Sequence, residues 1–310
     1  MNLIKKLKTS FQIKLSNDGR FLCHTMGLKT IVFDANSWEK VAELSKPKNP
    51  GDIKFSKNND YLYIKNTIGT VCVYETSEFC LIKTIQSNRS RQMVEGDFAL
   101  TNDDFTIIDI LKTKSGNQLA LINIDNGNYN KLTDFEDSIT IKKYEQYISN
   151  EGSHLFTLNN DNENTDYDDY NLLKVKYENE KASFTLISHP KVLHWESVIY
   201  DSIHEVYILV SGFEITILDS TFKKILKKKN LLKNESNGDF GYFYHLHQSN
   251  NAKFLVITYS EHVFILRYDD LQIIVDEAIS YACFAEFSED DQYLFIGTWN
   301  NGYILEVNLK

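Results

Sequence analysis

The stretch FSEDDQYLFIGTWNNGYILEVN, residues 287–308, contains a polar turn, an apolar strand, a glycine-containing turn and a second apolar strand. A loose copy, LSNDGRFLCHTMGLKTIVFDAN, occupies residues 15–36. Further apolar runs of the same kind recur at spacings of about 39 to 51 residues, which bracket the length of a β-propeller blade. The seven runs begin at Arg20, Tyr61, Phe105, Leu155, Val206, Phe254 and Tyr293.

A second marker recurs in step with these runs. An apolar residue followed by an acid occurs after six of them, as Phe33-Asp34, Tyr74-Glu75, Ile124-Asp125, Tyr177-Glu178, Leu218-Asp219 and Tyr268-Asp269; the last copy reads Val307-Asn308. A turn rich in Ser, Asn, Asp and Gly precedes most of the runs. Each unit therefore predicts four strands and no helix.

These units predict an all-β chain that forms one seven-bladed β-propeller of four-stranded antiparallel blades. The central runs are apolar at consecutive positions, which indicates burial on both faces and argues against a β-sandwich. The last unit has one strand fewer, and the spare strand Asn2–Thr9 is expected to complete it. The predicted blades are approximately 10–49, 50–94, 95–138, 139–193, 194–240, 241–280, and 281–310 together with 1–9.

With these features the chain resembles the WD-repeat β-propeller family over nearly its whole length. The Gly-His dipeptide of that family is absent, and Phe, Tyr, Ile or Leu replaces Trp in the Trp-Asp pair, so the resemblance is to a divergent, WD-like group. It implies that loops before the core strand share one face. Loops after the core strand and between blades share the other, which we call the long-loop face.

Composition excludes several classes of protein. A net charge of −10 and a sequence pI near 5.3 repel a nucleic-acid backbone. No apolar run approaches the roughly 20 residues that span a bilayer, and the amino terminus lacks the apolar segment of a secretory signal. A cytoplasmic monomer is expected. The four cysteines are expected to be buried thiols in a reducing compartment, although Cys72 and Cys80 could face each other across a hairpin.

Candidate metal ligands are sparse. The acidic stretch 161–170 lacks the central Gly and terminal Glu of an EF-hand loop, so a solvated hairpin tip or a site for a basic partner explains it better. His245 and His247 would share one face of a strand and could chelate, but the sequence names no third ligand. His189 and His194 form the other close pair. We expect no metal and no cofactor.

Catalytic motifs are also missing. The sequence has no G-x-S-x-G motif, no recognisable cysteine nucleophile and no glycine-rich nucleotide loop. The alternative to a non-catalytic protein is a propeller enzyme of the lactonase or lyase type with its site at the central channel, because such sites leave little local signature.

The long-loop face is the expected site of function, because the longest and most irregular loops lie there. We expect it to bind another protein, either as an interaction scaffold or as an immunity-type inhibitor of a toxin, and the acidic net charge would steer a basic partner. Trp195 is the expected anchor. The predicted contact residues are Arg89, Arg91, Tyr167, Asp168, His194, Trp195 and Trp299.

Overall fold

The computed structural model describes most of the chain. The described residues are 1–8, 11–87, 92–93, 97–101, 105–114, 116–132, 138–141, 147–148, 153–159, 170–178, 181–187, 195–232 and 240–309. The chain divides into two compact units, unit 1 with Met1–Ser45 and Trp195–Lys310, and unit 2 with Lys46–His194.

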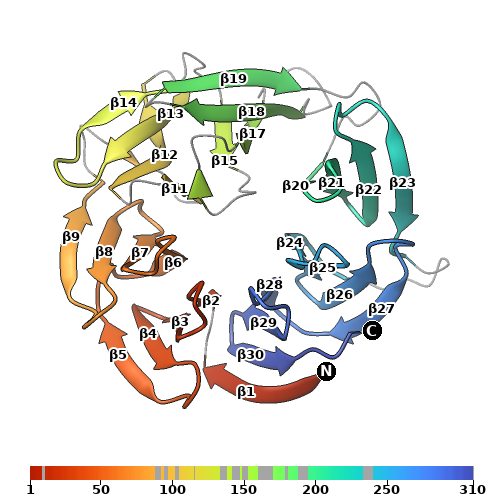
Figure 1. Cartoon of the computed structure of the whole chain (residues 1–310), viewed down its shortest axis with the longest axis horizontal. Helices are drawn as coiled ribbons and strands as arrows, with labels where there is room; N and C mark the ends of the chain where they lie inside the picture. Colours follow the sequence, from red (N-terminus) through yellow and green to blue (C-terminus); the bar gives the residue numbers. More distant parts are fainter. Residues whose placement is uncertain are drawn as a thin grey trace. The chain divides into compact units, whose positions relative to one another are not determined.

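Unit 1 is built from four-stranded antiparallel sheets, and three of them have their strands in the order of the chain (Figure 1). The first contains β2 (Ile13–Leu15), β3 (Phe21–Met26), β4 (Lys29–Asp34) and β5 (Lys40–Leu44). The next contains β20 (Ser197–Asp201), β21 (Val206–Ser211), β22 (Glu214–Asp219) and β23 (Ile225–Asn230). It is followed by the sheet of β24 (Phe243–Gln248), β25 (Phe254–Tyr259), β26 (His262–Arg267) and β27 (Ile273–Ala278).

The remaining sheet of unit 1 joins the two ends of the chain. It contains β28 (Ala282–Phe287), β29 (Tyr293–Thr298) and β30 (Asn301–Glu306), and β1 (Asn2–Lys8) lies along β30 (Figure 1). Asn2 is opposite Glu306 and Lys8 is opposite Asn301 in antiparallel register. The prediction that the N-terminal strand completes the last blade is confirmed.

Unit 2 holds two regular sheets and one larger sheet. The regular sheets consist of β6 (Pro50–Phe55), β7 (Tyr61–Asn66), β8 (Val71–Glu75) and β9 (Leu81–Ile85), and of β15 (Ser138–Ile141), β17 (Ser153–Asn159), β18 (Tyr170–Glu178) and β19 (Lys181–Ile187). The larger sheet has six strands: β10 (Gln92–Met93), β11 (Ala99–Thr101), β12 (Thr106–Thr113), β13 (Gly116–Asn123), β14 (Tyr129–Lys131) and β16 (Tyr147–Ile148).

The prediction of seven four-stranded antiparallel blades is wrong. In the described part of the chain, six blades have that form, and the sheet of β10–β14 and β16 does not. Its β12 and β13 have eight residues each, so β12 extends far enough for β10 to pair with Leu111 and Lys112. On its other side, the three-residue β11 pairs in parallel with β16.

All seven predicted core runs form the second strand of a meander, or its equivalent in the larger sheet: β3, β7, β12, β17, β21, β25 and β29. Most of their described side chains are buried, as the continuous apolar pattern predicted. The successive antiparallel meanders form a β-propeller fold.

The polar turns repeat one hydrogen-bond arrangement. The hydroxyl of Ser288 donates to Asp290 at 2.6 Å and accepts from the backbone N–H of Tyr293 at 3.0 Å. Ser16, Ser56 and Ser249 make the equivalent pair of bonds in their own turns. Asp219, the acid at the end of β22, also binds turn backbone groups: its Oδ1 accepts hydrogen bonds from the N–H groups of Lys223 and Lys224. The serines of these turns and the acids Asp34 and Asp219 therefore satisfy turn backbone groups.

Two further expectations concern thiols and membranes. All four cysteines are free; Cys23, Cys72 and Cys283 are buried as expected, whereas Cys80 is exposed. No helix in the described ranges is long and apolar enough to cross a membrane.

Candidate functional site

Most of the predicted contact residues cannot be placed. Arg89, Arg91, Tyr167, Asp168 and His194 lie outside the described residues. The acidic stretch 161–169 and His189 also lie outside them. The predictions that rest on these residues stay predictions.

The two predicted tryptophans have opposite environments. Trp195 is 1% exposed, so its ring belongs to the interior of unit 1 and is not offered to a partner at the surface. Trp299 is 53% exposed in the turn between β29 and β30. Of these two side chains, only Trp299 is available as a surface anchor in this structure.

Trp299 belongs to a group of exposed aromatic side chains on the long-loop face of unit 1. In an antiparallel meander, the turn between the second and third strands and the connection to the next sheet lie at the same end. Trp299 occupies such a turn, and Phe11, Tyr242 and Tyr281 occupy connections between sheets. Tyr242 is 82% exposed and Tyr281 is 56% exposed. We call Phe11, Tyr242, Tyr281 and Trp299 the aromatic band.

Short contacts join the members of the aromatic band. The rings of Phe11 and Trp299 lie 5.1 Å apart between centroids, and the N–H of Trp299 donates to the carbonyl of Tyr281 at 3.1 Å. Ser260 connects the other end: its carbonyl accepts from Ala282 at 3.0 Å and its N–H donates to the carbonyl of Tyr242 at 2.8 Å. One of these backbone bonds, from Ala282 to Ser260, crosses from sheet to sheet, and the other two lie within a single sheet.

Gly241 allows the close approach of the Tyr242 loop to this network. Its φ is +75°, and a Cβ at this position would lie 1.8 Å from Ser260 Oγ. Ser260 Oγ in turn accepts from the N–H of Tyr242 at 3.1 Å. A side chain at position 241 would therefore disturb the support of the most exposed ring of the band.

A second candidate site lies on the first strands of the sheets in unit 1. Glu286 on β28 is flanked by Lys14 on β2, at 3.1 Å from Oε2, and by His245 on β24, at 3.2 Å from Oε1. Burial raises the pKa of the Glu286 carboxyl, but Lys14, His245 and His247 outweigh burial and hold this pKa well below its usual range. The carboxylate stays charged between two basic side chains.

These residues do not form a metal site, although Glu286 is a third group beside the predicted histidine pair. The ammonium of Lys14 already occupies one side of the Glu286 carboxylate and would repel a cation. His247 Nδ1 accepts from the N–H of Phe287 at 3.4 Å, which assigns the ring proton to Nε2 and leaves no nitrogen of His247 open to a metal. The arrangement places the half-buried imidazole of His245 beside a charged carboxylate.

Unit 2 contains a more deeply buried group of charges. Lys65 donates to Asp109 at 2.6 Å, and both side chains are at most 1% exposed. Lys54, on β6, is equally buried and pairs with Asp97 and with Asp52. The ring of Phe98 lies 4.9 Å from Lys54 Nζ and 5.9 Å from Lys65 Nζ. These contacts tie β6 and β7 to β12, which carries Asp109, and to Asp97 and Phe98, which directly precede β11.

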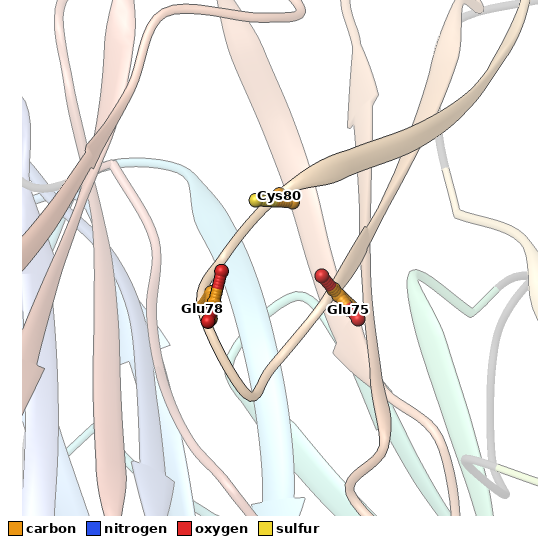
Figure 2. Close-up of side chains that lie close together, drawn as sticks. All are labelled: Glu75, Glu78 and Cys80. Atoms are coloured by element: carbon orange, nitrogen blue, oxygen red, sulfur yellow. The ribbon is translucent and has the colours of Figure 1, made fainter.

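Among the described residues, one group of side chains has the separations of a metal site. Glu75, Glu78 and Cys80 place ligand atoms within 4.8 Å of one another in the hairpin between β8 and β9 (Figure 2). Glu78 and Cys80 are exposed, and the turn follows the acid position that caps a turn in other sheets. Exposed acidic groups of this kind are common in turns, so we assign it no ion.

Sequence reasoning named Trp299 but missed the rest of the aromatic band. Tyr242 and Tyr281 directly precede β24 and β28, so large aromatic residues in connections between predicted blades were a usable signal. The partner of His245 was harder to find, because Glu286 is distant in sequence and reaches it only through the packing of neighbouring sheets.

Comparison with known proteins supports the fold but indicates no function. No protein-family model matches the chain, and no curated protein matches its sequence. Among solved structures, hydrazine synthase from Kuenenia stuttgartiensis is similar, with a TM-score of 0.71 and 13% sequence identity. The match covers 98% of this chain and 97% of the hydrazine synthase chain. At this identity the likeness shows the β-propeller fold alone.

Proposed function

We propose that this protein binds another protein on the long-loop face, as a non-catalytic scaffold or as an immunity-type inhibitor in the cytoplasm. A divergent WD-like propeller suits this role, because its sheets form a rigid support for variable loops. The supporting observation is the aromatic band, which is exposed, contains the adjacent rings of Phe11 and Trp299, and is held by backbone hydrogen bonds.

The composition of the band fits an interface. Trp and Tyr are enriched among the residues that dominate binding energy, because they bury a large area with few rotatable bonds. The Phe11 and Trp299 pair supplies adjacent rings, and their exposure in the free protein leaves that area to be buried by a partner. Trp299 takes the anchoring role that the sequence suggested for Trp195.

Capture of partners from the native cell tests this proposal. A Trp299→Ala, Tyr281→Ala variant is compared with the wild type and with an Ile203→Ala control. Ile203 is 62% exposed in the turn between β20 and β21, at the opposite end of the sheets. We expect the band variant to lose a partner that the wild type and the control retain. Equal retention by all three proteins would reject the long-loop face of unit 1 as the binding surface.

The alternative function is a propeller enzyme of the lactonase or lyase type. The observation in its favour is the half-buried His245 beside Glu286 and Lys14, on first strands that would border the central channel of a propeller. A screen with lactones and sugar acids tests it. Turnover that disappears in Glu286→Gln but persists in the band variant would establish this alternative.

A further inference from the structure

The charge around Tyr242, Tyr281 and Trp299 is acidic. Segments 240–242, 260–262, 277–281 and 298–301 carry Glu261 and Glu277 but no lysine or arginine. Glu261 lies within the backbone network of the band, because its N–H donates to Phe240 and its carbonyl accepts from Ile279 at 3.0 Å. Glu277 is exposed on β27, opposite Val263. This part of the band is therefore bordered by carboxylates, whereas the Phe11 end has Lys8 of β1 opposite Asn301.

A third carboxylate, that of Glu196, lies at the same end of the neighbouring sheet. Glu196 Oε2 accepts from the N–H of Gly212 at 3.0 Å, and the hydroxyl of Tyr259 donates to the carbonyl of Gly212 at 2.6 Å. Burial and then the charge of Glu196 raise the pKa of Tyr259, the residue that precedes Ser260. Glu196 therefore lies at the Gly212 turn, which the Tyr259 hydroxyl joins to the sheet that carries Tyr242. In the next sheet, Lys29 is already paired with Glu43.

We propose that the aromatic band and Glu196, Glu261 and Glu277 recognise an arginine-rich segment of a protein partner. This inference rests on the proposed protein-binding function and names the chemistry of its partner. Guanidinium groups stack on Trp and Tyr faces and also pair with carboxylates, so one residue type satisfies both parts of the surface. A purely apolar partner would cover these carboxylates without compensating their charge, which is unfavourable.

The net charge of −10 supports the same partner chemistry at longer range. An acidic protein attracts a basic segment before contact, and this attraction weakens as salt screens it. The aromatic contacts depend less on salt. Binding should therefore weaken with added salt but retain a part that depends on Trp299 and Tyr242.

Fluorescence anisotropy with labelled peptides tests this inference on the full chain. The probes are a peptide of alternating Arg and Leu and the same peptide with Gln in place of Arg. The protein variants are Trp299→Ala with Tyr242→Ala, and Glu261→Gln with Glu277→Gln. The control is Ile203→Ala with Glu205→Gln, which makes the same kinds of change in the turn between β20 and β21.

We expect the Arg peptide to bind the wild type and the control equally, and to bind each band variant about tenfold more weakly, as two lost cation–π or ion-pair contacts predict. Equal, Trp299-dependent binding of the Gln peptide would overturn the arginine inference but leave the protein-binding function standing. Arg-peptide binding that all variants share would reflect bulk charge and overturn the inference. Absence of Arg-peptide binding would overturn it as well.

Discussion

The pKa values of two carboxyls, Glu286 in unit 1 and Asp109 in unit 2, are shifted in opposite directions. Both carboxyls are desolvated, and each has a lysine as partner. Glu286 is flanked by a lysine and a histidine and keeps 15% of its side chain exposed, whereas Asp109 is fully buried with Lys65. The pKa of Glu286 is held well below its usual range, but burial raises the pKa of Asp109 despite Lys65.

The number of basic neighbours and the depth of burial therefore decide which effect prevails. In Glu286 the attraction of several basic groups exceeds the desolvation penalty, and in Asp109 it does not. The first group is suited to remain charged at a solvent-accessible surface. The second is suited to fix the packing of two sheets, since neither partner can be lost without leaving a buried charge.

Of these changes, removing the Asp109 carboxylate should have the largest effect on the free energy of unfolding. Asp109→Ala leaves the ammonium of Lys65 buried without its carboxylate, and we expect a loss of about 3–5 kcal/mol in the free energy of unfolding. Urea unfolding of this variant, beside an Asp269→Ala control at an exposed position, measures it. A loss below about 1 kcal/mol would show that the Lys65–Asp109 pair is not a determinant of stability.

Replacing each carboxyl by its amide should give a smaller, pH-dependent effect of opposite sign at the two sites. The folded pKa of Glu286 is lowered, so its stabilisation is present above the unfolded pKa of about 4.3 and is lost as pH falls toward the folded pKa. The folded pKa of Asp109 is raised, so stability is gained below the unfolded pKa of about 3.9 and lost as pH rises through the folded pKa.

As the pH falls, the free energy of unfolding of the wild type should accordingly decrease relative to that of Glu286→Gln. Over the same pH range it should increase relative to that of Asp109→Asn. Urea titrations at a series of pH values down to acid conditions provide both comparisons. Parallel pH dependences of the two variants would contradict the assignment of opposite pKa shifts.

Local repetition explains how much of the fold the sequence could predict. The hydroxyls of Ser16, Ser56, Ser249 and Ser288 and the carboxylates of Asp34 and Asp219 act within their own turns, so their pattern can be read directly from the chain. The strands β10 and β16 were missed, because two-residue strands depend on an available edge of another sheet and carry no period of their own.

Exposure was the less predictable property. Trp195 and Trp299 both lie next to turns, yet one is buried and the other is exposed. The difference depends on which neighbours pack against each ring, and residues distant in sequence decide that. The aromatic band became visible only when Phe11, near the start of the chain, was placed beside Trp299.

Site-specific cross-linking tests the central claim, partner binding on the long-loop face of unit 1, most directly. A photoreactive phenylalanine analogue is introduced at Tyr242 in one protein and at Ile203 in another, and both are irradiated in the native cell. Both positions are strongly exposed but lie at opposite ends of the sheets. We predict a discrete cross-linked protein from position 242 and none from position 203; cross-linking only at 203, or at neither position, would contradict the claim.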